Sequence, residues 1–170
     1  MSSVLVSSSR AHEVAAAVVD PEMPFLTLED LGVLRGVEVG EDESDRWVRI
    51  TITPTYTGCP ALTAMRDDLV RRLSEAGFDP VDVVVTLDPP WSSDDITERG
   101  REALREHGFS PPGPAERAIP LTLIRRPREL TCPRCGAGPA QLVSEFGSTS
   151  CKALYRCPSC LEPFEHVKEL

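Results

Sequence analysis

The spacing of apolar residues along the first part of the chain predicts a helix followed by two strands. Residues 10–19 carry alanine and valine at helical spacing, and Ser8 or Ser9 precedes them as an N-cap. Residues 33–39 and 47–53 alternate apolar and polar side chains, which is typical of half-buried strands. A short charged loop joins these two segments, so we expect them to pair as an antiparallel hairpin.

A helix, a strand and another helix follow. Residues 60–76 place apolar side chains on one helical face and charged side chains on the other. Residues 81–87 alternate as a third strand, and Ser92 or Ser93 is expected to cap a helix that ends near His107. The order of these elements predicts an α+β fold, in which a small mixed sheet packs with two or three helices.

The composition changes at residues 109–114, which contain three prolines and a glycine. We therefore divide the chain into a domain of residues 1–114, an extended linker of residues 115–130 and a small β module of residues 131–170. The segments of this module that can form strands are residues 141–146, 152–156 and 164–168. Its large apolar residues are few: Leu142, Phe146, Leu154, Tyr155 and Phe164.

Two cysteine pairs in this module predict a metal site. Cys132 and Cys135 form one pair, Cys157 and Cys160 the other, and each pair lies in a short turn that contains proline. Two such turns can bring four thiolates into a tetrahedron, so we expect a structural zinc ion in a zinc ribbon. A single iron also fits a tetrahedral site of four cysteines, as in rubredoxin-like electron carriers, and free thiols or disulfides are the remaining alternative.

Three other residues are weaker candidates for binding. Cys151 is a packing residue or at most a spare ligand, and His166 could replace a cysteine ligand, although four cysteines already satisfy zinc. Trp91 follows two prolines and is either a packing residue or a partner contact. The sequence contains no glycine-rich phosphate loop, Ser-His-Asp arrangement or di-iron carboxylate cluster. An enzyme that acts alone is therefore the least expected class.

Charge and hydropathy limit the classes of partner that we expect for the protein. Residues 1–130 have 14 Arg against 23 Asp or Glu, a net charge of −9, whereas residues 131–170 are neutral. An acidic body repels a phosphate backbone, so we expect no nucleic-acid partner. No apolar run is long enough to span a bilayer, and the N-terminus lacks the features of a signal peptide. We expect a cytoplasmic protein without membrane association, whose thiols stay reduced.

Cys59 lies apart from the other cysteines, directly before Pro60 at the start of a predicted helix. We expect it at or next to the N-cap, where free N–H groups and the helix dipole favour a thiolate. Such a thiolate can act as a nucleophile, bind a soft metal or hold an iron–sulfur cluster transiently. The alternative is that Cys59 is a small buried apolar residue. No His or Lys lies nearby in sequence as a base, which argues against covalent catalysis. Asp20 and Glu22 flank a proline and could be ligands or bases.

Several motifs in order resemble a known family. The iron–sulfur assembly domains typified by SufT are similar in Asp20-Pro-Glu-Met-Pro24, Asp30-Leu-Gly32 and Thr53-Pro-Thr-Tyr-Thr-Gly-Cys-Pro60. The PaaD family, encoded with the multicomponent ring 1,2-phenylacetyl-CoA epoxidase, is similar also in Leu87-Asp-Pro-Pro-Trp-Ser-Ser-Asp-Asp-Ile96, Ser144-Glu-Phe-Gly-Ser-Thr149 and Cys151-Lys-Ala-Leu-Tyr-Arg-Cys157. The chain thus resembles an assembly domain followed by a zinc ribbon.

The resemblance implies an accessory role in phenylacetate degradation, in which the protein helps to mature an iron–sulfur cluster or metal centre of the epoxidase. The iron–sulfur reductase subunit is the first candidate partner, and a homodimer is an open alternative. Within the family Cys59 is the expected functional thiolate, with Asp20, Glu22 and Thr55 as neighbours and a transient cluster or iron as its cargo. An electron carrier with iron in the four-cysteine site and a purely structural subunit are the alternatives.

Overall fold

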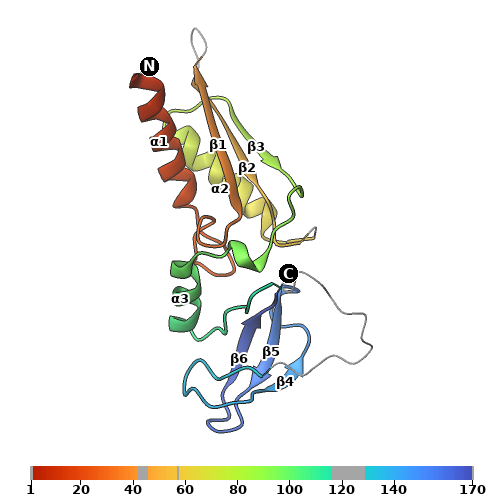
Figure 1. Ribbon diagram of the computed structural model, residues 1–170. Helices are drawn as coiled ribbons and strands as arrows, with labels where there is room; N and C mark the ends of the chain where they lie inside the picture. The colour runs from red at the N-terminus through yellow and green to blue at the C-terminus, as the bar shows by residue number, and fades with distance from the viewer. Residues whose placement is uncertain (1, 42–45, 57, 116–128, 170) are drawn as a thin grey trace. The chain divides into compact units, whose positions relative to one another are not determined.

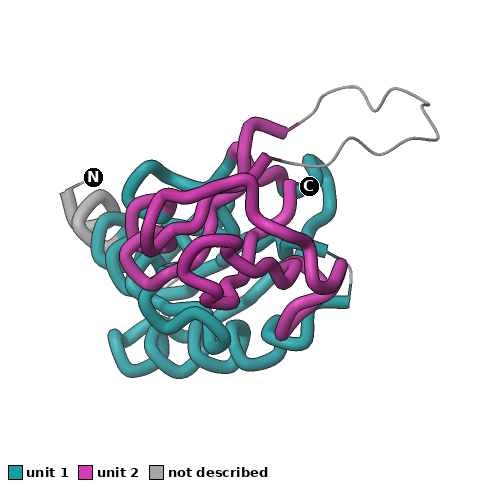
Figure 2. The backbone as a smooth tube through the Cα atoms, turned by 90° about the horizontal axis from the view of Figure 1, so that it is seen from below, with its two compact units in different colours: residues 1–91, 95–100 teal, residues 92–94, 101–170 magenta. Residues whose placement is uncertain are grey.

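The computed structural model describes residues 2–41, 46–56, 58–115 and 129–169. Two compact units make up the chain: unit 1 comprises residues 1–91 and 95–100, and unit 2 comprises residues 92–94 and 101–170 (Figure 2). The division into residues 1–114, 115–130 and 131–170 stays a prediction, and residues 116–128 of the expected linker lie outside the described residues. Within the described part of the chain, no helix is both long and apolar enough to cross a membrane.

A three-stranded mixed sheet forms the centre of unit 1 (Figure 1). β1 (Leu34–Glu41) pairs antiparallel with β2 (Arg46–Ile52), and β2 pairs parallel with β3 (Val81–Val85). The alternation of β2 buries one of its faces, through Val48, Ile50 and Ile52. The predicted hairpin and the α+β class are therefore confirmed. β3 ends two residues earlier than expected, and the Leu87 side chain is 49% exposed.

Two helices cover the buried face of this sheet. α1 (Ser2–Ala16) contacts β1 and α2 (Leu62–Glu75), and α2 also contacts β3 (Figure 1). The apolar stripe of α2 behaves as its spacing predicts, because the buried side chains are Met65, Leu69 and Leu73. Helical spacing on the sequence thus identified the face of α2 that enters the core.

The bounds predicted for the first helix are wrong at both ends. α1 begins at Ser2, so Ser8 and Ser9 lie inside the helix, where serine costs little helical stability. The helix ends at Ala16 because the following backbone forms bonds with a later segment. Leu28 N–H donates to the Val18 carbonyl at 2.8 Å, and Asp20 N–H donates to the Leu26 carbonyl at 3.0 Å.

The segment after β3 contributes a large side chain to the interior of unit 1. Trp91 is buried, and its Nε1–H donates to the Leu31 carbonyl at 2.7 Å, so of the two alternatives it is a packing residue. The next helix starts later than expected. α3 (Glu98–Glu106) follows a single 3-10 turn, η1 (Ser93–Asp95), and Thr97 caps it by accepting a hydrogen bond from Gly100 N–H at 3.0 Å.

A small antiparallel sheet forms most of unit 2. Its strands are β4 (Gln141–Ser144), β5 (Lys152–Arg156) and β6 (Pro163–Val167), paired in that order. The predicted strands are therefore confirmed, with small changes at their ends. The buried core of the ribbon is short of large side chains, and its members are Cys132, Ala140, Ala153, Tyr155, Cys157 and Phe164. Two of the few large apolar residues of the module, Leu142 and Phe146, do not join this core, because both are exposed.

Candidate functional site

The four paired cysteines lie in two tight turns of unit 2. The first turn precedes β4, and Gly136 N–H donates to the Cys132 carbonyl at 2.9 Å. The second turn joins β5 to β6, and Cys157 N–H donates to the Glu162 carbonyl at 3.0 Å. Each turn closes with a residue of left-handed backbone conformation, Gly136 with φ +72° in the first and Leu161 with φ +63° in the second. Glycine adopts this conformation without strain, whereas leucine does not.

The two turns bring four sulfur atoms together. All four Sγ atoms lie within 4.8 Å of one another. The Cys132 and Cys160 sulfurs are 3.8 Å apart, and the Cys135 and Cys157 sulfurs are 3.5 Å apart. A zinc ion with bonds of about 2.3 Å to four sulfurs sets their separation at about 3.8 Å. The residues therefore fit zinc, and the prediction of a metal-binding group of four cysteines is confirmed.

Backbone N–H groups favour negative charge at this site. Ser159 N–H and Cys160 N–H each donate to the Cys157 sulfur at 3.4 Å. The bond from Cys160 N–H is the largest influence that lowers the pKa of the Cys157 thiol to about 6. The pKa of Cys160 moves the other way. The Glu162 backbone bond favours its thiolate, but the neighbouring cysteine sulfurs and burial outweigh that bond and raise the pKa to about 12.

The site has the character of a closed structural metal centre. Cys132 and Cys157 are buried in the ribbon core, whereas Cys135 and Cys160 are exposed at its edge. Four sulfur ligands fill the coordination sphere of zinc, which leaves no position for a substrate. Within the described residues, the metal-binding group does not extend to Cys151 or to His166.

Other contacts account for these two weaker candidates. The Cys151 sulfur is half-buried and lies 3.1 Å from the Thr149 hydroxyl oxygen. His166 is fully buried, and its Nδ1 lies 3.2 Å from both the carbonyl and the hydroxyl oxygen of Ser110. The other ring nitrogen, Nε2, lies 3.5 Å from a carboxylate oxygen of Glu169. The side chains of Cys151 and His166 therefore contact other residues of unit 2 and not the four sulfurs.

Cys59 lies just outside α2 rather than at its N-cap, which is Ala61. Pro60 has no N–H, and the backbone turns twice before the helix starts. Cys59 N–H donates to the Tyr56 carbonyl, and Leu62 N–H donates to the Cys59 carbonyl, each at 3.3 Å. The Cys59 side chain is partly buried and forms no disulfide. The thiol therefore lies ahead of the helix, on a turn and not in the apolar core.

The loop of Cys59 lies at one edge of the sheet of unit 1. Because β2 and β3 run parallel and β1 runs antiparallel, the segments after β2 and β3 meet the segment before β1 there (Figure 1). Backbone bonds join these segments, since Thr53 N–H donates to the Val33 carbonyl at 2.9 Å and Thr86 N–H donates to the Ile52 carbonyl at 3.0 Å. Thr55 is the third residue after the end of β2 and so lies in a segment at this edge.

The three residues predicted as neighbours of Cys59 differ in their surroundings. Asp20 is buried, and its Oδ1 accepts hydrogen bonds from Glu22 N–H at 2.7 Å and Met23 N–H at 2.9 Å. That carboxylate therefore shapes the turn after α1. Glu22 is exposed and Thr55 is half-buried. A role for these residues beside the thiolate stays a prediction.

Sequence reasoning missed a buried ion pair in the ribbon. Lys152 is 2% exposed, and its Nζ lies 3.6 Å from a carboxylate oxygen of Glu165. The Glu165 carboxylate also accepts hydrogen bonds from the backbone and the hydroxyl of Ser148. Period-two alternation places Lys152 on the same face of β5 as the exposed Arg156, so no local pattern predicted its burial.

Both parts of the chain match family models. Residues 13–83 match the model described as "Iron-sulfur cluster assembly protein", and residues 117–168 match the model described as "PaaD zinc beta ribbon domain". These matches agree with the fold of unit 1 and with the four-cysteine ribbon of unit 2.

One relative extends the match over nearly the whole chain, and others match parts of it. A putative 1,2-phenylacetyl-CoA epoxidase subunit from Escherichia coli (strain K12) is 45% identical over 167 residues, which cover 96% of this chain and 95% of that protein. "Protein AE7-like 2" of Arabidopsis thaliana is 52% identical over 40 residues, 24% of this chain and 27% of that protein. The crystal structure of a DUF59 domain from Bacillus anthracis is 28% identical with a TM-score of 0.53, and the match covers 61% of this chain and 95% of that one.

Proposed function

Because the chain belongs to the PaaD family of 1,2-phenylacetyl-CoA epoxidase subunits, we propose that it is an accessory subunit of such a system in the cytoplasm. It assists the assembly of an iron–sulfur cluster or another metal centre in a partner subunit, and the iron–sulfur reductase is the first candidate. The match of residues 13–83 to an iron–sulfur cluster assembly domain supports this role.

The position of Cys59 carries the proposal. Its thiol is partly accessible, lies on a turn ahead of α2, and belongs to the assembly domain. Thiolate sulfur is the ligand that iron–sulfur clusters prefer, and stable clusters usually take four such ligands. One thiolate therefore holds iron or a cluster incompletely, which suits a cargo that must leave again. Asp20, Glu22 and Thr55 are candidate residues for orienting that cargo.

The ribbon serves a different purpose in this proposal. Its closed site of four cysteines fits zinc and leaves no open coordination position, so the ion fixes the fold of the ribbon. A rigid module of this kind is suited to bind a partner subunit while Cys59 delivers its cargo.

Replacement of Cys59 tests the proposal. In cells that lack the native protein, Cys59→Ser should fold, bind zinc normally and leave the partner subunits short of iron and of epoxidase activity. Cys151→Ser is the matched control, because Cys151 is also half-buried and lies outside the four-cysteine group. It should support normal loading. Fully loaded and fully active partner subunits in the Cys59→Ser strain would refute the role of the thiolate.

An electron carrier is the second candidate function, and the exposure of two ligands favours it. Cys135 and Cys160 lie at the surface, where an electron could enter or leave a bound iron. Ferric iron bound by four cysteines is coloured and zinc is colourless, so a visible spectrum with elemental analysis of the purified protein separates the two. A purely structural subunit would instead co-purify with the epoxidase in fixed stoichiometry, and Cys59→Ser would change nothing.

A further inference from the structure

β3 is an edge strand of unit 1, and its outer side has no partner strand among the described residues. The strand order of the sheet is β1-β2-β3, so β3 pairs with β2 alone (Figure 1). No backbone hydrogen bond from any other described segment reaches residues 81–85. Proteins usually protect such an edge with proline, lysine, a bulge or a covering segment. Residues 81–85 contain neither proline nor lysine, and they pair with residues 48–52 in unbroken register.

The hydrogen bonds to β2 show which backbone groups of β3 point outward. Just before β3, Val48 N–H donates to the Pro80 carbonyl at 3.0 Å. Just after it, Thr86 N–H donates to the Ile52 carbonyl at 3.0 Å. A strand bonds to one neighbour through every second residue, so the even-numbered residues of β3 bond to β2. The residues whose N–H and C=O groups face outward are Val81, Val83 and Val85.

The exposed apolar side chains of unit 1 belong to β3 and its neighbours. Among the described residues of this unit, the large apolar side chains that are exposed are Val70, Val84 and Leu87. Val84 lies on β3, Leu87 lies two residues after its end, and Val70 lies on α2, the helix that contacts β3. Val81 and Val85 are half-buried. A strand added beside β3 would cover these two valines and remove apolar area from water.

The outer edge of β3 is complementary to the same edge of a second copy. In an antiparallel pair with a two-fold axis at Val83, the two Val83 residues exchange both of their hydrogen bonds. Val81 of each copy then exchanges both of its bonds with Val85 of the other copy. All the outward-facing N–H and C=O groups of both strands are satisfied in this way. The segment Val81-Asp-Val-Val-Val85 reads almost the same in both directions, so this register also places valine opposite valine.

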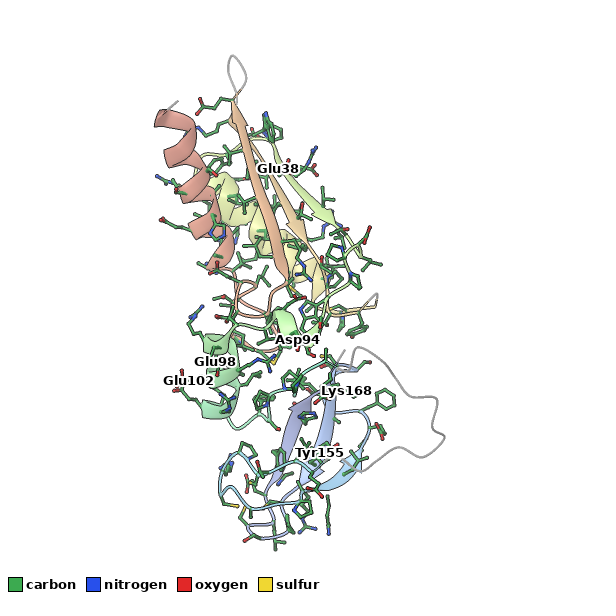
Figure 3. The ribbon with its side chains drawn as sticks, in the orientation of Figure 1. Glu38, Asp94, Glu98, Glu102, Tyr155 and Lys168 are labelled. Carbon is green, nitrogen blue, oxygen red and sulfur yellow. The ribbon has the colours of Figure 1, made fainter. Side chains whose placement is uncertain are left out.

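This register also keeps the carboxylates of the two strands apart. Asp82 of one copy lies opposite Val84 of the other, so the two Asp82 side chains do not face each other directly. Each Asp82 also has a cation in its own copy, because Arg49 Nε–H donates to its carboxylate at 2.9 Å. Figure 3 labels Glu38 on β1, which lies opposite Arg49 on the side away from β3. The pairing therefore needs no cation from the second copy.

We propose that the chain forms a two-fold dimer through the outer edge of β3. The dimer joins two three-stranded sheets into one sheet of six strands, in the order β1-β2-β3-β3-β2-β1. The partner is a second copy because one short segment satisfies both edges at once, as a closed two-fold interface requires. The interface does not rest on the proposed function. Antiparallel pairing puts the carboxyl ends of the two β3 strands at opposite ends of the joined sheet, so each copy keeps its own Cys59 loop.

Sedimentation velocity of the full chain tests whether the dimer forms. The dimer fraction should rise with protein concentration. It should also rise with salt, because each chain carries a formal charge of −9 and salt screens the repulsion between copies. Amide hydrogen exchange locates the interface. The amides of Val81, Val83 and Val85 should become protected as the dimer forms, whereas those of Asp82 and Val84 bond to β2 and should be protected at every concentration.

Charge changes at Val84 test the register. Val84 is 37% exposed, so Val84→Lys and Val84→Glu should both fold. Lysine faces Asp82 of the other copy twice in the dimer and should lower the Kd about two- to thirtyfold, and glutamate should raise it by a similar factor. Val143→Lys and Val143→Glu are the matched controls, because Val143 is an exposed valine of unit 2 and these variants change the net charge equally. They should change the Kd much less.

A proline tests the backbone bonds themselves. Val85→Pro removes an N–H group that faces away from β2, a position where edge strands tolerate proline, and should raise the Kd at least about tenfold. Val85→Ala keeps the N–H group and controls for the lost side chain. Tryptophan fluorescence shows whether unit 1 is folded in each variant, and the Val84 variants decide the question if Val85→Pro unfolds.

Three results would overturn the β3 interface. The first is a chain that stays monomeric at every concentration and salt. The second is a dimer with the same Kd in Val84→Lys and Val84→Glu. The third is exchange of the outward-facing valine amides at the same rate in monomer and dimer. Cys59→Ser should dimerise with the wild-type Kd, so a failure of the transfer role and a failure of this interface are distinguishable.

Discussion

Removal of the metal should unfold the ribbon of unit 2 and leave unit 1 folded. Besides its cysteines, the apolar core cluster of the ribbon contains two large side chains, Tyr155 and Phe164, together with two alanines. Burial of each large side chain contributes about 2–3 kcal/mol, so the pair contributes about 5 kcal/mol. Zinc binding at a structural cysteine site contributes about 10–16 kcal/mol at neutral pH. The metal therefore stabilises the ribbon more than its apolar core does.

The distribution of tryptophan separates the two units in one experiment. Both tryptophans, Trp47 and Trp91, lie in unit 1, so tryptophan fluorescence reports unit 1 alone. Amide hydrogen exchange in β4, β5 and β6 reports the ribbon. After chelation, protection in the three strands should disappear while the fluorescence stays constant. Cys132→Ser should behave like the chelated protein, and Cys151→Ser should not. Strands that stay protected once elemental analysis shows the metal to be absent would refute the reasoning.

Three further predictions concern single groups. Zinc affinity should rise with pH across the neutral range. The Cys160 thiol, with a pKa of about 12, must release a proton to bind zinc, whereas the Cys157 thiol, with a pKa of about 6, has already lost its proton. A competition titration at two pH values measures the affinity, and equal affinities would contradict the prediction. Gly32→Ala should lower the free energy of unfolding of unit 1 by about 2–4 kcal/mol, because Gly32 has φ +65° and a Cβ there would overlap the backbone of Asp95. Urea unfolding followed by tryptophan fluorescence measures this loss. Leu161→Gly should stabilise the metal-bound ribbon by up to about 1 kcal/mol, because it removes the backbone strain of a leucine at φ +63°. A lower Tm of the ribbon in this variant would contradict the prediction.

The parts of the structure that follow from local periodicity were predictable from the sequence. Alternation identified β2 and its inward side chains, and helical spacing identified the buried stripe of α2. The four-cysteine group was predictable because two CxxC turns have few other arrangements that satisfy a metal. The start of α1 was harder to predict, since serine both caps helices and occurs inside them, as Ser8 and Ser9 do.

The remaining features depend on tertiary contacts that leave no local pattern. The exposure of Phe146 could not be read from its size or apolar character, because it depends on the turn between β4 and β5, where Ser148 binds Glu165 of β6. The burial of Lys152 was missed because lysine is rarely buried without a partner, and its partner lies on another strand. Trp91 could not be assigned either, since its hydrogen bond reaches Leu31, a residue far away in sequence.

The chain contains only two lysines, and the ribbon places them very differently. Lys152 is enclosed beside Glu165, whereas Lys168 stands over the Phe146 ring with its amine near the surface. Amine-reactive reagents should therefore label this protein at Lys168 and at its α-amino group, and hardly elsewhere. A cross-linker attached to the Lys168 amine lies beside Phe146. Mass spectrometry of the cross-linked products would therefore identify the residues of any protein bound near Phe146.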